Sequence, residues 1–137
     1  MKGLTVLLVL TLVMPAAALG AEPLTRTFPE SVDRMWTVTE SVLKHLGWDI
    51  DRADRTIGFI TTESRQVDGE NYGVYEKGTR HRLQVRVKAV GGNRTAVTVE
   101  RLLFKRERIL FVDKDEPLTS NDRSVERAVL DTIAKAL

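Results

Sequence analysis

The chain has 137 residues, no cysteine and 42% hydrophobic residues, and its 21 basic side chains nearly balance 19 acidic ones. This length suits one domain and is too short for two well-formed cores. The lack of cysteine excludes disulfides, thiolate zinc sites, iron–sulfur clusters and thiol nucleophiles, and the balanced charge does not indicate a nucleic-acid-binding protein.

Residues 1–21 have the pattern of a secretory signal peptide. Lys2 supplies a positive charge, residues 4–14 form an apolar run, and small residues predominate at positions 16–21. The apolar run is roughly half as long as a transmembrane helix needs. Bacterial lipoprotein signals end at a cysteine, which this chain lacks, so no lipid anchor is expected. The pattern predicts a soluble periplasmic protein whose single domain spans residues 22–137.

The predicted domain begins with a strand and an amphipathic helix. Residues 24–28 have the composition of a short strand, which Pro29 ends. Residues 30–46 carry apolar side chains, Trp36 among them, at steps of three and four, which predicts a helix with one buried face. Gly47 is placed to end this helix in the left-handed conformation.

The sequence period then changes from 3.6 to 2, which predicts β-strands. Strands are expected at residues 48–51 and 57–67, and a glycine-rich loop is expected at residues 68–79. Residues 80–90 form the most regular strand pattern, with apolar and polar side chains alternating from Arg82 to Ala89, which indicates a strand with one buried face.

Residues 91–93, Gly-Gly-Asn, predict a hairpin turn, after which residues 95–106 return as an antiparallel strand. The alternation of this strand slips after Val99. A β-bulge near Glu100 and Arg101 would restore the phase, and we therefore expect one there.

Residues 109–112 form a further apolar run, either as a continuation of this strand or as a separate edge strand. A polar loop is predicted at residues 113–121, and residues 122–137 return to helical spacing. The element order is β-α-β-β-β-β-α. We therefore expect an α+β fold in which two helices pack on one face of an antiparallel sheet of about four to five strands.

Part of this pattern resembles a known family. The residues that carry the resemblance are Trp36, Leu43, Leu46-Gly47-Trp48, Ile50, Asp54-Arg55, Gly58 and Ile60-Thr61. Their types and spacing resemble the helix-grip domain of BamC, the lipoprotein subunit of the machinery that assembles β-barrels in the bacterial outer membrane. The resemblance implies a helix-grip-like fold and a place in the cell envelope. The chain departs from the family because it has no lipid-anchor cysteine and one domain instead of two.

The sequence contains none of the common catalytic motifs. The G-x-S-x-G elbow, the P-loop and the H-E-x-x-H pair are all absent. His45 and His81 are the only histidines, and two ligands are too few for a metal site. We therefore expect no enzymatic activity, no metal and no other cofactor.

One face of the sheet is predicted to be basic. Arg82, Arg86 and Lys88 share the outward face of one strand, and Arg101 is placed beside them on the next. The full set on the two strands is Arg80, Arg82, Arg86, Lys88, Arg101, Lys105, Arg106 and Arg108. Such a face suits an acidic protein or an anionic polymer. Alternatively, cross-strand glutamates pair with these side chains and the face is only a solvated surface.

Tyr72 and Tyr75 lie in the predicted glycine-rich loop. Tyrosines among glycines are typical of an adaptable recognition loop, although they would equally suit packing over the sheet edge. The basic face and this loop predict a non-enzymatic envelope protein that binds a protein or polymer partner, but no nucleic acid. Outer-membrane biogenesis is the process that the resemblance suggests. The alternative is a carrier of small apolar ligands with a cavity between helices and sheet.

Overall fold

The computed structural model describes residues 22–137, so the predicted signal peptide lies outside the described residues. The elements in chain order are β1 (Leu24–Phe28), α1 (Val32–His45), β2 (Ile50–Asp54), β3 (Phe59–Thr62), β4 (Arg65–Asn71), β5 (Glu76–Gly91), β6 (Arg94–Ile109), β7 (Val112–Leu118) and α2 (Ser124–Lys135). All strand pairs are antiparallel. The predicted α+β class with an antiparallel sheet and two helices is confirmed.

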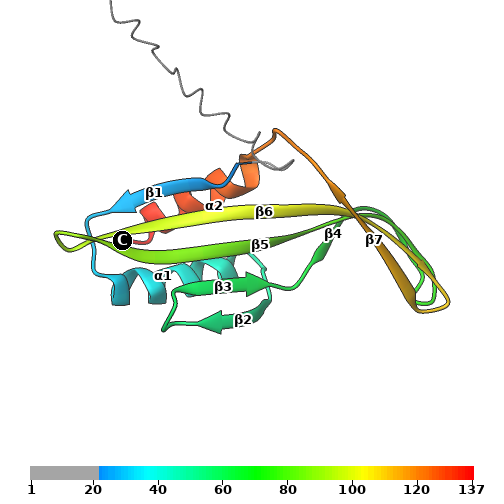
Figure 1. Ribbon diagram of the computed structural model, residues 1–137, viewed down its shortest axis with the longest axis horizontal. Helices are drawn as coiled ribbons and strands as arrows, with labels where there is room; N and C mark the ends of the chain where they lie inside the picture. Colours follow the sequence, from blue (N-terminus) through cyan, green and yellow to red (C-terminus); the bar gives the residue numbers. More distant parts are fainter. Residues whose placement is uncertain (1–21) are drawn as a thin grey trace, which may run out of the picture.

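Two long strands, β5 and β6, run through both parts of the molecule (Figure 1). In the first part, which we call the body, the strand order is β1-β6-β5-β3-β2 and both helices pack on the sheet. In the second part, β5 and β6 continue past the helices and are flanked by β4 and β7. We call this second part, residues 65–81 and 103–118, the arm.

The body has an apolar core between its helices and its sheet. Leu83 and Val85 of β5 are fully buried and alternate with outward-facing residues, as the period of two predicted. Leu43 of α1 and Ile133 of α2 are also fully buried and pack in the same cluster. These large side chains form the apolar core between the helices and the sheet. The alternative of an apolar-ligand carrier stays a prediction.

In the arm, the buried face of the sheet is the one opposite to the helices. β5 and β6 pair in unbroken register from Glu76 to Ala89, so the predicted β-bulge near Glu100 and Arg101 is wrong. Phe104, three residues after Arg101, therefore lies on the face turned away from the helices. It is only 9% exposed because the arm buries that face instead. The slip in hydrophobic alternation after Val99 therefore shows where the buried face of β6 changes from the helix-covered side to the opposite side.

The sheet has 7 strands, more than the four to five expected. Residues 68–79, predicted as a loop, form a hairpin in which β4 pairs with the start of β5. Gly69 and Gly78 face each other there, and a Cβ on Gly78 would stand 2.1 Å from the backbone oxygen of residue 68. Close approach of two strands therefore requires these glycines. Residues 113–121, predicted as a loop, contain most of β7.

Candidate functional site

The arm ends in two connections that are joined by a backbone hydrogen bond. Residues 72–75 connect β4 to β5, and Leu110-Phe111 connects β6 to β7. The backbone N–H of Phe111 donates to the carbonyl oxygen of Val74 at 3.2 Å. We call the exposed side chains at this end the apolar tip: Tyr72, Tyr75, Ile109, Leu110, Phe111 and Val112.

The apolar tip exposes a large hydrophobic surface. Phe111 is 75% exposed, Tyr72 71% and Leu110 64%. With about 150–200 Å² for each side chain, the exposed surface of the tip is on the order of 600 Å². This area lies at the upper end of what the largest patch on an ordinary monomer reaches, and patches of this size mark sites of interaction.

The turn that presents Leu110 and Phe111 has an unusual backbone for such residues. Their φ angles are +52° and +64°, as in the two-residue turns that close β-hairpins. The β5–β6 hairpin in the same molecule has matching angles, but there Gly92 and Asn93 occupy the turn. Glycine and asparagine adopt this conformation readily, whereas a bulky residue pays about 1–2 kcal/mol for it. The β6–β7 turn thus exposes two large apolar side chains to solvent, although their backbone conformation is unfavourable for such residues.

Hydrogen bonds within the protein satisfy several backbone groups of the tip. The N–H of Tyr72 donates to the carbonyl oxygen of Tyr75 at 2.7 Å, and the N–H of Val74 donates to that of Tyr72 at 3.0 Å. The N–H of Gly73 donates to the side chain of Asn71 at 2.9 Å. The tip is therefore internally bonded although its side chains are exposed.

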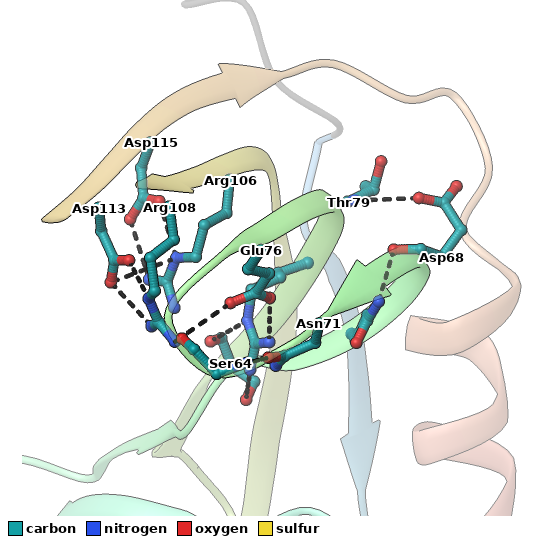
Figure 2. Close-up of polar contacts among 12 residues, drawn as sticks. Ser64, Asp68, Asn71, Glu76, Thr79, Arg106, Arg108, Asp113 and Asp115 are labelled. Carbon is teal, nitrogen blue, oxygen red and sulfur yellow. Dashed lines mark hydrogen bonds and ion pairs between the residues drawn. The ribbon is translucent and has the colours of Figure 1, made fainter. Parts of the chain in front are cut away.

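Behind the tip, charged side chains fill the concave face of the arm (Figure 2). Glu76 is only 3% exposed and accepts a hydrogen bond of 2.7 Å from Arg80. Arg80 also donates to the hydroxyl and the carbonyl oxygen of Ser64, each at 2.9 Å. Arg108 lies 3.6 Å from the second carboxylate oxygen of Glu76. A buried glutamate is thus held between two arginines from neighbouring strands.

Two further pairs connect β6 to β7 on the same face. Arg106 donates to both oxygens of Asp115, at 2.9 and 3.0 Å, and Arg108 donates to both oxygens of Asp113. These hydrogen bonds lower the pKa of both carboxyl groups and raise the pKa of both guanidinium groups, because they favour the charged forms. Ion pairs therefore take much of the place of an apolar core in the arm.

The structure separates the two predicted parts of the binding surface. Tyr72 and Tyr75 belong to the apolar tip, whereas Arg82, Arg86 and Lys88 are exposed on the sheet face turned away from the helices. At about 3.3 Å per residue, some 40 Å of β5 separate Tyr75 from Lys88. Arg82 and Arg86 lie above the rings of phenylalanines on that face, with the guanidinium carbons 5.8 and 5.7 Å from the ring centroids.

The predicted place of Arg101 on the basic face is wrong. Its side chain is 9% exposed and lies on the helix-covered face, with Nε 3.4 Å from a carboxylate oxygen of Glu126 in α2. Its Nη1 lies 3.2 Å from Nδ1 of His81. The expected β-bulge would have turned Arg101 outward, and without the bulge the strand alternation turns it inward.

Two titratable groups with displaced pKa values, His81 and Glu126, lie in this buried cluster. Burial lowers the pKa of His81, and with the smaller effects of the positive charges of Arg101 and Arg65 the pKa falls to about 4. Burial also raises the pKa of Glu126. Since His81 is 9% exposed and Glu126 is fully buried, both groups are enclosed beneath the helix layer.

Two features of the site were not predicted from the sequence. The Leu110-Phe111 turn has no glycine or asparagine, so the usual hairpin signal is missing. The run of four apolar residues at 109–112, directly after an alternating strand, was the available signal for an exposed connection. The arm strands that carry the charged network show no periodic spacing of apolar residues, and their sequences therefore contain no pattern that predicts burial.

No protein-family model and no curated protein matches the sequence. The resemblance to the BamC domain therefore stays a prediction. Within residues 22–137, no helix is long and apolar enough to cross a membrane. In the same part of the chain, no three histidine, aspartate or glutamate side chains gather as a metal site would require. Fold and site define an α+β protein with a charged β arm that ends in an apolar tip.

Proposed function

We propose that this protein is a non-enzymatic binding protein of the bacterial cell envelope and that it contacts its partner through the apolar tip. The observation that carries the proposal is the strained turn that holds Leu110 and Phe111 in solvent at the end of the arm. The signal-peptide pattern of residues 1–21 supports export. The resemblance to the BamC domain supports a place in the envelope, with outer-membrane biogenesis as the process served.

The arm distributes its side chains in the reverse of the usual way. Its concave face holds charged groups such as Glu76 and Arg108, while Leu110 and Phe111 extend into solvent. Burying charge carries a desolvation penalty, and leaving apolar side chains exposed forgoes the stabilisation that burial would give. Backbone strain and lost stability of this kind are concentrated where proteins contact other molecules. The distribution therefore supports a contact site at the tip.

The buried titratable groups beneath the helices support a binding role over catalysis. His81 and Glu126 have displaced pKa values, but both are enclosed beneath the helices and contact Arg101. A general acid or base must come within hydrogen-bond reach of its substrate. Groups enclosed in this way are suited to holding α2 on the sheet.

The basic face formed by Arg82, Arg86 and Lys88 is not the main contact in this proposal. Exposed positive charges attract an anionic partner over a distance of about 10 Å, and salt screens that attraction. An apolar contact is less sensitive to salt and sets how long the partner stays bound. We therefore assign the main contact to the apolar tip.

Fractionation of tagged variants tests the proposal, with each protein produced from the complete gene in its host. The tip double variant carries Leu110→Asn and Phe111→Gly. The matched control is Ile57→Asn, which removes a similarly exposed side chain (71%) from a turn of the body. We expect wild type and Ile57→Asn to associate with the envelope fraction and the tip double variant to move to the periplasmic extract.

A charge-reversal variant, Arg82→Glu with Arg86→Glu and Lys88→Glu, distinguishes the two surfaces. Release of this variant together with retention of the tip double variant would place the contact on the basic face and overturn the proposal. Equal association of all four proteins with the envelope would overturn it as well.

A further inference from the structure

We infer that the partner of the apolar tip is the surface of a lipid bilayer, with Leu110 and Phe111 entering the boundary between headgroups and acyl chains. This inference rests on the tip as the contact site of the proposed function and adds the chemistry of the partner. Four observations on the tip support it: its shape, its backbone hydrogen bonds, its tyrosines and the charges behind it.

The shape of the tip suits a deformable partner. About six residues of β5 separate Arg82, at the start of the arm, from Glu76, so about 20 Å of strand lies between the body and the tip. Leu110 and Phe111 form the turn at that end and are largely exposed. Apolar side chains of a peripheral protein enter a bilayer to a depth of about 5–10 Å, which a two-residue turn can reach. A folded partner would need a preformed pocket of matching shape.

The backbone of the tip is prepared for a medium without hydrogen-bond partners. A peptide group that enters the apolar region must be satisfied within the protein, because lipid tails offer no partner. The N–H groups of Tyr72, Gly73, Val74 and Phe111 all donate to acceptors of the tip itself or of Asn71. Arg108 donates to the carbonyl oxygen of Gly73 at 3.3 Å.

Tyr72 and Tyr75 extend the apolar turn with side chains of the interfacial type. A tyrosine has an apolar ring and a polar hydroxyl, and it is enriched where a protein crosses the level of the headgroups. Both tyrosines are exposed, and the hydrogen bond from Phe111 to Val74 holds their connection against the β6–β7 turn. The tyrosines thus accompany the two side chains that enter deepest.

The charges behind the tip are balanced. On the outer face of the arm, residues of alternating sign face each other across the four strands: Glu70, Lys77, Glu107 and Lys114. On the inner face, Asp113 pairs with Arg108. A balanced collar is complementary to zwitterionic headgroups, whereas binding to anionic lipid requires a cluster of positive charge. We therefore expect binding to neutral bilayers with little dependence on salt.

A second copy of the chain is a less suitable occupant. With an exposed tip surface on the order of 600 Å², two tips bury at most about 1,200 Å², which is the lower limit for a stable interface. Two convex ends cannot cover each other completely, so a tip-to-tip pair would fall below that limit.

Co-sedimentation with vesicles of phosphatidylcholine and phosphatidylethanolamine tests the inference, with protein purified after expression of the complete gene in its host. We expect wild type and Ile57→Asn to bind equally. The tip double variant should bind about 100-fold more weakly, because it loses two apolar side chains. Added phosphatidylglycerol or salt should change the binding of wild type by less than about threefold.

A fluorescent probe reports where the tip goes. Trp36 and Trp48 are 4% and 2% exposed in the body, so vesicles should leave their emission unchanged. The variant Phe111→Trp adds one tryptophan at the tip. We expect its additional emission to shift to shorter wavelength with vesicles and to be quenched by brominated acyl chains.

The outcomes separate this inference from the proposed function. If wild type fails to bind vesicles, the lipid inference is wrong, and tip-dependent envelope association would then assign the tip to a protein partner. Equal vesicle binding by wild type and the tip double variant would overturn the inference too, as would an unquenched Phe111→Trp probe. A dimer in light scattering that the tip double variant abolishes would assign the tip to a second copy of the chain.

Discussion

Replacing Leu110-Phe111 by Asn-Gly should stabilise the protein although it removes two apolar side chains. Both residues have positive φ angles, the conformation that asparagine and glycine adopt readily. The β5–β6 hairpin, with Gly92 and Asn93 at matching angles, shows how the same turn is built from favourable residues. The substitution therefore relieves strain at a position where little burial is lost.

The expected gain follows from the φ angles and the exposed fractions. Relief of left-handed strain at two bulky residues contributes about 2–4 kcal/mol. Leu110 is 64% and Phe111 75% exposed, so the lost burial costs only about 1 kcal/mol. The extra freedom of glycine in the unfolded chain costs up to about 1 kcal/mol more. The free energy of unfolding should thus rise by about 1 kcal/mol, which raises Tm by about 4 °C.

Thermal and urea unfolding monitored by circular dichroism measure this change. The reciprocal variant, Gly92→Leu with Asn93→Phe, is the matched control and should lower the free energy of unfolding by about 2 kcal/mol. A lower Tm for the Asn-Gly variant, by several degrees, would refute the reasoning. It would mean that Leu110 and Phe111 stabilise the arm and are not held against a penalty.

Three further predictions concern the body and the arm. Arg101→Ala should lower the free energy of unfolding by about 3 kcal/mol in urea titrations, because it leaves the buried carboxylate of Glu126 without its partner. The control Arg86→Ala should change it by less than about 0.5 kcal/mol. Equal effects of the two variants would contradict the burial of Arg101. The free energy of unfolding should also decrease between pH 6.5 and about 4, by at most about 3 kcal/mol, because His81 takes up a proton in this range only when the chain unfolds. His81→Gln should remove this pH dependence. A pH dependence that persists in the variant would assign it to another group. As the pH falls below 3.8, Asp113 and Asp115 become protonated and lose their ion pairs. The backbone amides of the arm should then lose protection in hydrogen-exchange mass spectrometry before those of the body do. Simultaneous loss in both parts would contradict an arm held by ion pairs.

The body was predictable because its core is apolar and lies on one side of each element. Burial against that core produces the period of 3.6 in α1 and the period of 2 in the helix-covered half of β5. The strand at residues 24–28 and the end of α1 at Gly47, with a φ of +83°, agree with the prediction for the same reason.

The arm was not predictable because charged side chains occupy its buried face. Arg106 and Arg108 point inward while Lys105 and Glu107 point outward, so the sequence shows no contrast between the two faces. Most of β7 was assigned to a polar loop because its residues 113–116 are all charged. The tyrosines of the tip were predicted from their loop composition, but Leu110 and Phe111 were not, since they form a hairpin turn from residues that rarely do so.

The alternation of inner and outer residues along the arm has a consequence for how its length can change. Each residue adds about 3.3 Å to a strand and reverses the direction in which the next side chain points. Inserting one residue into each strand would bring the outer charges inside and expel Arg106 and Arg108 from the concave face. A two-residue insertion in each strand preserves both faces. The length of the arm can therefore change only in steps of about 7 Å. The same steps set the possible distances between the body and the surface that the tip contacts.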